Sequence, residues 1–174
     1  MDCTQRAHEQ AVGDRFVRWY NEQHHAAFVF VGRPDGAPDL TYRDDHRELN
    51  LEITDCYYDA DDATVKWMNA RQQRNAPTEW TGMNFDASLI ESVNSALRHK
   101  CTHRYGIDCL LVVNVSPALT TAEEMAELLH GITILKEHCW KGIYLAGTFG
   151  DSSDGSIGGC RVWELYPRPF GATQ

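Results

Sequence analysis

Apolar and polar residues alternate on both sides of a short polar run, residues 44–47, and this pattern predicts a β-hairpin. A two-residue loop inside this run places Leu40 opposite Leu51, and Asp39 opposite Glu52. Opposed residues in an antiparallel pair point to the same face. A shift of register would mix apolar with polar residues, so the Asp39 and Glu52 carboxylates are expected side by side. One face carries Leu40, Tyr42, Leu49 and Leu51, and the other carries Asp39, Thr41, Arg43, Glu48, Asn50 and Glu52.

The remaining hydrophobic patterns predict helices and strands in an orderly succession. Residues 4–23 repeat apolar side chains at helical spacing, and Thr121 with Glu124 forms a capping box that opens a later helix. Residues 26–31 predict a short buried strand, and the almost wholly apolar run 109–115 predicts a strand covered on both faces. The predicted elements are helix 4–23, strand 26–31, the two hairpin strands, helices 59–75 and 86–104, strand 109–115, helix 121–138, and strands 142–148 and 161–166.

This order of elements indicates an α/β fold in which helices flank a mixed β-sheet. The chain of 174 residues, 43 % of them hydrophobic, fits a single domain spanning residues 1–174 with a sizeable core. The N-terminus lacks a signal-peptide pattern, and no apolar run approaches the roughly 20 residues that a bilayer span needs. The 6 cysteines are scattered without a CxxC pair, which is typical of reduced thiols. We therefore expect no membrane association and a cytoplasmic location.

The charge distribution bears on which partners the chain can bind. The 16 Lys and Arg against 25 Asp and Glu give a formal net charge of −9, which repels nucleic acid at long range. Two local basic strips depart from this balance. Each is interpreted either as a set of phosphate contacts or as a solvated helix face. The strips are Lys66, Arg71 and Arg74, and Arg98, Lys100 and Arg104 with His99 and His103 among them.

A helix, a three-strand meander, a helix and a strand, with Pro38-Asp39 opening the second strand and Glu52 near the end of the third, resemble the PD-(D/E)XK nuclease superfamily. The resemblance runs from the first helix to at least Val115. It implies a restriction-endonuclease-like core, αβββααβ followed by αββ, and an endonuclease-like hydrolase. In that family the two acids and the carbonyl that follows the second acid hold Mg²⁺. The resemblance therefore implies Asp39, Glu52 and the carbonyl of Ile53 as ligands for Mg²⁺ or Mn²⁺.

The sequence departs from the family pattern at Thr54, where the family has Lys. Thr54 lies on the strand face of Glu52 and can orient a water, but it cannot supply the positive charge that stabilises a developing phosphorane. Some superfamily members place this charge on a neighbouring helix, which leaves two alternatives. Lys100 projects within the core-facing stripe of its predicted helix, about 20° from Leu89, and Lys66 lies on the helix after the motif. The competing interpretation of each lysine is an ammonium that simply reaches water.

The carboxylate pair also has a competing interpretation. Asp39 and Glu52 would form a solvated strand-end pair, in which opposed carboxylates repel by a few tenths to about 1 kcal/mol. A bound cation would remove this repulsion, and the metal interpretation is favoured for that reason. Some superfamily members add an acid from the first helix. Glu9 and Glu22 are the available residues, and both are expected on the surface.

These observations favour a Mg²⁺- or Mn²⁺-dependent phosphodiesterase that acts on DNA and contacts it through the basic strips. One alternative is a catalytically inactive descendant of the fold that binds a protein partner through its acidic surface. Another is a zinc enzyme that uses His99 and His103, with Cys101 and Cys109 nearby. Many relatives with this fold act as dimers, so a homodimer also stays open.

Overall fold

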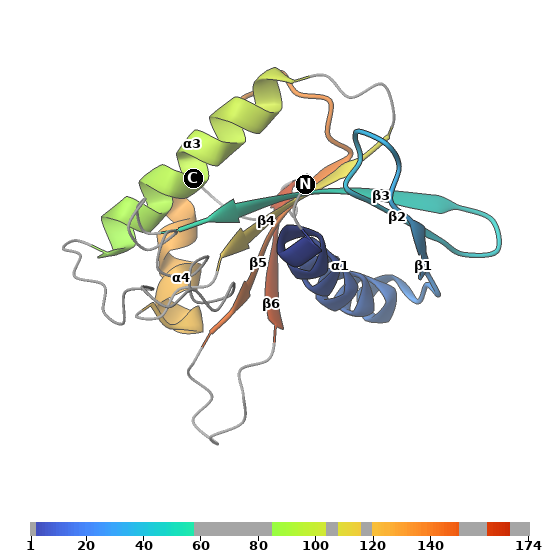
Figure 1. The fold of residues 1–174 in the computed structure, drawn as a ribbon. Coiled ribbons are helices and arrows are strands. Elements are labelled where there is room, and N and C mark those ends of the chain that lie inside the picture. The colour runs from blue at the N-terminus through green and yellow to red at the C-terminus, as the bar shows by residue number, and fades with distance from the viewer. Residues whose placement is uncertain (1–2, 58–84, 104–107, 116–119, 150–159, 168–174) are drawn as a thin grey trace.

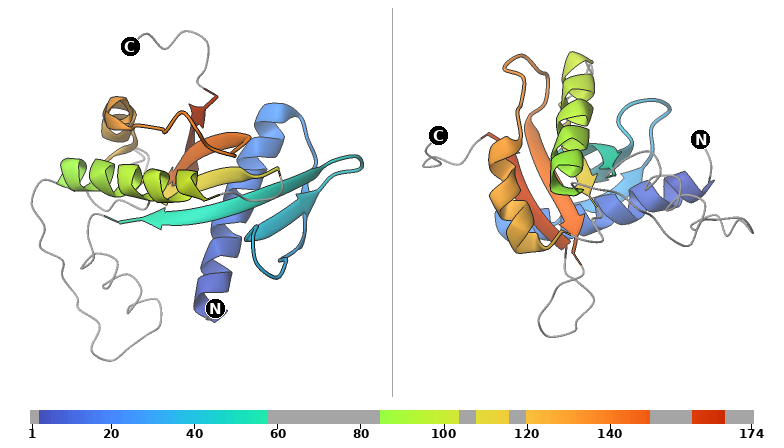
Figure 2. Two further views of the ribbon diagram at one scale, coloured as in Figure 1. Left: turned by 90° about the horizontal axis from the view of Figure 1, so that it is seen from above. Right: turned by 90° about the vertical axis from the view of Figure 1, so that its left-hand side faces the viewer.

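The computed structural model describes residues 3–57, 85–103, 108–115, 120–149 and 160–167. Their strands form a six-stranded mixed sheet in the order β1-β2-β3-β4-β5-β6. Helix α1 covers one face of the sheet, and α3 and α4 cover the other (Figures 1 and 2). The predicted α/β class, a mixed sheet flanked by helices, is confirmed. The elements are α1 (Cys3–His24), β1 (Val29–Gly32), β2 (Leu40–Arg43), β3 (Glu48–Cys56), α3 (Phe85–Thr102), β4 (Leu110–Val115), α4 (Ala122–Leu128), the 3₁₀ turn η1 (Leu129–Gly131), β5 (Gly142–Thr148) and β6 (Cys160–Tyr166).

The sheet combines antiparallel and parallel pairs. Strands β1, β2 and β3 form an antiparallel meander, β3, β4 and β5 run parallel, and β6 returns antiparallel to β5. Parallel neighbours need a long crossover connection, usually a helix. Helix α3 lies in the connection from β3 to β4, and α4 lies in the connection from β4 to β5.

The hairpin of β2 and β3 has the register that its sequence predicts. Leu40 pairs with Leu51, and the ladder runs to Arg43 opposite Glu48. Asp44 closes the turn, because its N–H donates to the Arg47 carbonyl at 3.0 Å. The apolar face of the hairpin packs under α1, and the polar face points to the side of the sheet that α3 covers.

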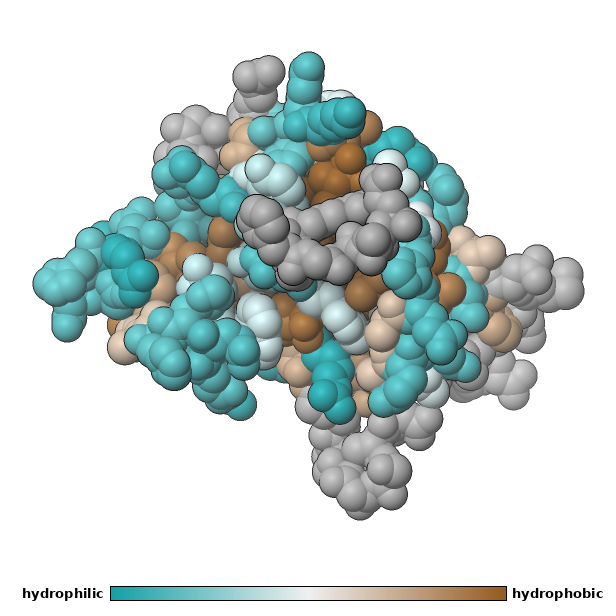
Figure 3. Space-filling view, turned by 180° about the vertical axis from the view of Figure 1, so that it is seen from behind, coloured by the Kyte–Doolittle hydropathy of each residue, from teal (hydrophilic) through white to brown (hydrophobic). Residues whose placement is uncertain are grey.

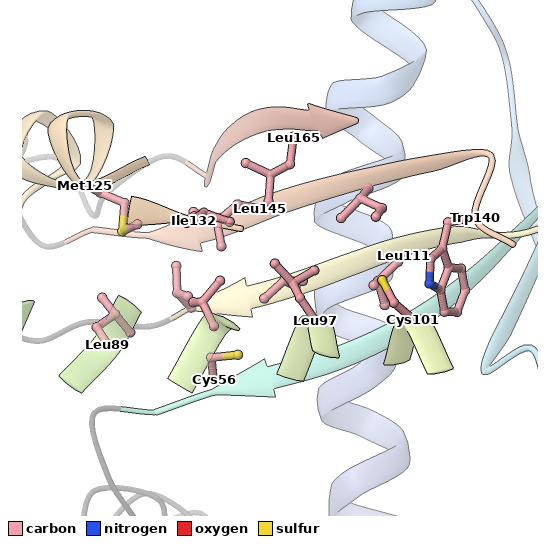
Figure 4. Close-up of a cluster of buried hydrophobic side chains, with 14 of the residues drawn as sticks. Cys56, Leu89, Leu97, Cys101, Leu111, Met125, Ile132, Trp140, Leu145 and Leu165 are labelled. Carbon is pink, nitrogen blue, oxygen red and sulfur yellow. The ribbon is translucent and has the colours of Figure 1, made fainter. Parts of the chain in front are cut away.

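Two hydrophobic clusters hold the layers together. Val12 and Phe16 of α1 pack on one face of the sheet with Val112 of β4. Leu111 and Val113, the neighbours of Val112, point to the opposite face and pack with α3 and α4 (Figure 4). All residues of β4 are buried, which confirms the prediction of a strand covered on both faces. The side chains labelled on the α3 side in Figure 4 are Cys56, Leu89, Leu97, Cys101, Leu111, Met125, Ile132, Trp140, Leu145 and Leu165.

Strand β1 departs from the predicted buried strand. Val29, Phe30 and Val31 are 65 %, 45 % and 50 % exposed, so the prediction of burial is wrong. The reason is position, because β1 is an edge strand that pairs only with β2. Phe30 still packs its ring on Tyr42, with centroids 5.6 Å apart.

The helix predicted over 121–138 is shorter than expected. The capping box at Thr121 is confirmed, but α4 ends at Leu128 and continues only as the turn η1. Asn94 of α3 explains the early end. Its side chain donates to the Gly131 carbonyl at 2.9 Å and accepts the Thr133 N–H at 2.8 Å, which holds the chain extended while it enters the core.

Hydrophilic side chains predominate on the face drawn in Figure 3, where hydrophobic residues appear as separate patches. Across the described ranges, no helix is both long and apolar enough to cross a membrane. The helix predicted over 59–75 lies outside the described residues, and so do Lys66, Arg71, Arg74 and Arg104 of the basic strips.

Candidate active site

The two acids of the hairpin lie where β2 begins. Asp39 directly precedes β2, and the register places it opposite Glu52 of β3, next to the Leu40–Leu51 pair. Glu52 is 6 % exposed and Asp39 is half-buried. The two carboxylates are therefore held side by side and largely out of bulk water, unlike a solvated strand-end pair.

The backbone of Ile53 completes this edge of the sheet. The bond between Asp44 and Arg47 fixes which ladder residues exchange hydrogen bonds, and by alternation the N–H and C=O of Ile53 point toward the start of β2. The ladder ends at the Leu40–Leu51 pair. Beyond it Pro38 has no N–H to donate, and the Asp39 side chain accepts the Ile53 N–H at 2.9 Å. The Ile53 carbonyl therefore has no ladder donor from Pro38, and it lies on the same side of β3 as the Asp39 carboxylate.

Lys100 brings a positive charge to the pair. It lies in the last turn of α3, and its Nζ is 2.8 Å from Glu52 Oε1. Its side chain is 19 % exposed, because it continues the buried stripe that includes Leu89 and Leu97. Of the two lysines considered from the sequence, Lys100 reaches an acid of the pair, whereas Lys66 lies outside the described residues.

Thr54 shares the face of Glu52 but lies further along β3. Strand geometry places the two residues about 7 Å apart. The Thr54 side chain is half-buried, and within the described residues its hydroxyl makes no hydrogen bond. It can therefore bond to a water or a ligand on this face, but it does not touch either acid.

Sequence reasoning missed an ion pair beside the acids. Glu9 was expected on the surface, which is wrong, since it is 6 % exposed and accepts a 2.7 Å bond from Arg33. Arg33 also donates to the carbonyls of Arg6 and Asp39, the latter at 3.5 Å. Glu22, the other acid considered, is exposed near the far end of α1. The sequence does offer one signal for the Glu9–Arg33 pair, which is that Arg33 lies in the turn-rich segment before the second strand.

A pocket of about 450 Å³ lies beside the two acids at the edge of the sheet. Arg6, Arg33, Asp39 and Glu52 line it, together with the loop over 34–37 that joins β1 to β2. This loop rises on the same side of the sheet as α3 (Figures 1 and 2). The pocket therefore opens directly onto both carboxylates.

Burial and neighbouring charge act on Asp39. The pKa of the Asp39 carboxyl is raised from 3.8 to about 6, chiefly by burial and in addition by the negative charges of Glu52 and Glu9. The Ile53 N–H and the Lys100 ammonium act in the opposite direction. Ionised Asp39 is thus destabilised in the fold, and either a proton or a cation would relieve it.

The raised pKa of Asp39 predicts how stability depends on pH. Folded protein keeps a proton on Asp39 that the unfolded chain has lost, so the metal-free protein should lose stability as pH rises from 3.8 to about 6. Asp39→Asn retains an oxygen to accept the Ile53 N–H and removes the titration. Chemical denaturation of both proteins across this range should show the wild type falling relative to the variant, and parallel curves would contradict the prediction.

The same titration governs binding of a cation. A divalent ion needs the ionised carboxylate, so its affinity should rise with pH up to about 6 and then level off. Calorimetric titration with Mn²⁺ at several pH values measures this. A pH-independent affinity would mean that Asp39 is not a ligand.

The donor set fits a hard divalent ion. Two carboxylates and one carbonyl offer oxygen ligands, and Mg²⁺ is commonly held by one or two carboxylates while it keeps several waters. Among the described residues, no three His, Cys, Asp or Glu side chains gather as a preformed metal cluster. The same finding weighs against the zinc alternative within the described residues. His99 and His103 have ring centroids 4.6 Å apart, but Cys101 is buried in the core, and no three such side chains gather in this described part of the chain.

Comparisons with known proteins do not place this chain in a family. No family model, curated protein or solved structure matches this chain. The resemblance to PD-(D/E)XK nucleases therefore rests on the residues and strand arrangement described above.

Proposed function

We propose that this chain is a metal-dependent phosphodiesterase of the PD-(D/E)XK type that acts on nucleic acid, with DNA as the expected substrate. The observation that carries the proposal is the convergence on Glu52 of Asp39 from the strand start and Lys100 from α3, whose Nζ lies 2.8 Å away. An antiparallel meander followed by a crossover helix and a parallel strand supports the same class.

The residues divide the chemistry of hydrolysis among them. Asp39, Glu52 and the Ile53 carbonyl would hold the divalent ion, which supplies Lewis acidity and lowers the pKa of a bound water. Water adds across the ester: a new P–O bond forms to the water oxygen, the P–O bond to the leaving oxygen breaks, and that oxygen takes a proton. Lys100 stabilises negative charge on the phosphoryl oxygens, and Thr54 orients a water.

A second candidate is the catalytically inactive module that binds a protein partner. It is favoured by the ion pair itself, because Lys100 already offsets the charge of Glu52 without a metal. The absence of the motif lysine at Thr54 and the net charge of −9 support it as well. The two candidates differ in one property, which is whether the carboxylate pair binds a divalent ion.

Mn²⁺ binding, measured by titration calorimetry at neutral pH, separates these candidates. Wild-type protein should bind Mn²⁺, and Glu52→Ala should lose binding, because one of two carboxylate ligands is removed. Glu48→Ala is the matched control, since Glu48 lies on the same strand face, is exposed and pairs with Arg43. Asp39→Asn tests the second ligand with little change in shape. Absence of binding to folded wild type at millimolar Mn²⁺ would leave the interaction module as the function.

A further inference from the structure

The pocket beside the carboxylate pair carries two arginines that the proposed reaction does not use. Arg6 comes from the first turns of α1, and Arg33 comes from the loop after β1. Both line the same space as Asp39 and Glu52. The pocket thus combines guanidinium groups, which can bind a phosphate, with carboxylates, which can bind the divalent cation that accompanies it.

Arg33 is fixed in place with donors to spare. Its guanidinium donates to Glu9 and to the carbonyls of Arg6 and Asp39. An arginine has five N–H donors, so its Nε–H and one Nη2–H have no partner among the described residues. Its side chain is 21 % exposed and lines the pocket. A rigid guanidinium of this kind suits bidentate binding of a phosphate.

Arg6 supplies a guanidinium to a pocket that is also lined by three acids, Asp35, Asp39 and Glu52. Its side chain is exposed, and it has no acidic partner within the described residues. Several other cations form ion pairs with acids. They are Arg43 with Glu48, Arg98 with Glu91, and Lys100 with Glu52. Arg98 of the basic strip is therefore committed to an acid, and Lys100 is held at the proposed metal site by Glu52, whereas Arg6 can meet an anion that enters the pocket.

The size of the pocket limits what that anion can be. Its volume of about 450 Å³ lies in the range of small-ligand sites, about 300–1,000 Å³. Duplex DNA is recognised over a larger and strongly positive protein surface, about 1,000–2,500 Å². The net charge of −9 opposes such a surface, and within the described ranges the cations Arg43, Arg98 and Lys100 are paired with acids. One nucleotide with its phosphate matches the pocket better.

We infer that Arg6 and Arg33 bind a phosphate at the end of a single-stranded nucleic acid, which brings the terminal phosphodiester to Asp39 and Glu52. The inference rests on the proposed function, because it assigns that reaction its substrate class. It makes Arg33 and Arg6 substrate-binding residues. It predicts that a linear single strand binds more tightly than continuous duplex.

Binding of an internally labelled oligothymidylate, measured by fluorescence anisotropy with Ca²⁺ in place of Mn²⁺, tests the inference on the full chain. Arg6→Ala should weaken binding about tenfold, the loss expected for one charge-assisted contact. Arg6→Lys should retain part of the affinity. Arg18→Ala is the matched control, an exposed arginine of the same helix that does not line the pocket. A circularised strand and a duplex closed by hairpins at both ends should bind more weakly than the linear strand.

Equal weakening by Arg6→Ala and Arg18→Ala would show bulk charge alone and overturn the inference, as would equal affinity for linear strand and closed duplex. A different result would overturn the proposed function, namely the absence of Mn²⁺ binding to the wild-type protein. Arg6→Ala should keep normal Mn²⁺ binding, so the two failures are distinguishable.

Discussion

Lys100→Met is expected to lower the rate of phosphodiester hydrolysis by about 10²–10³-fold, the cost of removing one group that stabilises charge in the transition state. Methionine keeps most of the apolar stem that continues the α3 stripe, so the variant removes the ammonium 2.8 Å from Glu52 and little else. The rate is measured on labelled single-stranded DNA with Mn²⁺. Arg98→Met is the matched control, because Arg98 lies on the same helix and pairs with the exposed Glu91.

The same variant should also destabilise the metal-free protein. Glu52 would be left as a buried charge without its ammonium partner, beside Asp39, and breaking such a pair costs about 3 kcal/mol. Added Mn²⁺ should recover part of this loss if the carboxylates bind it. Full activity in Lys100→Met would contradict the role of Lys100. If Lys66→Met were inactive instead, the charge would belong to Lys66.

Gly13→Val is expected to cost about 3 kcal/mol or more of the free energy of unfolding, because the helix and the sheet meet at Gly13 without room for a side chain. A Cβ there would lie 2.3 Å from Leu40 Cδ1 and 2.7 Å from the Tyr42 hydroxyl. Neither neighbour can yield easily: Leu40 is fully buried, and the Tyr42 hydroxyl donates to Asp14 at 2.8 Å.

The control for this variant is Gly32→Val, since a Cβ at Gly32 meets nothing within 4 Å and valine is favoured in a strand. Thermal and chemical unfolding of both variants give the comparison. Because Leu40 adjoins Asp39 in the hairpin, Gly13→Val should also weaken Mn²⁺ binding. Equal stability of the two variants would mean that α1 can move away from the sheet without cost.

The local alternation of apolar and polar residues is enough to predict that Asp39 and Glu52, the two carboxylates of the candidate site, lie side by side. The pairing of Leu40 with Leu51 follows from which register keeps apolar residues on one face, and the same register puts Asp39 opposite Glu52. Lys100 can be singled out because a charged residue on an apolar stripe must reach something polar. Its contact with Glu52 cannot be derived in this way, since that contact depends on how α3 crosses the sheet.

Properties set by distant contacts are not accessible from the sequence. The exposure of β1 depends on strand order, which an apolar run such as Val29–Val31 does not encode. Glu9 and Arg33 meet across 24 positions of sequence and share no periodic pattern. The end of α4 is decided by Asn94 on another helix. In each case the missing information is tertiary, because local propensity does not report the partner.

Pro38 has a consequence for how this fold can evolve. Any other residue at that position would add a backbone N–H two residues before the Leu40–Leu51 pair, where the β2–β3 ladder now ends. If that N–H reached the Ile53 carbonyl, it would lengthen the ladder and occupy an oxygen that the proposed metal site uses. On the proposed function, selection for a longer ladder and selection for an accessible oxygen would then act in opposite directions at Pro38. A descendant that no longer needed the oxygen would be free to replace this proline, so the residue at position 38 in related chains would indicate whether the site is still in use.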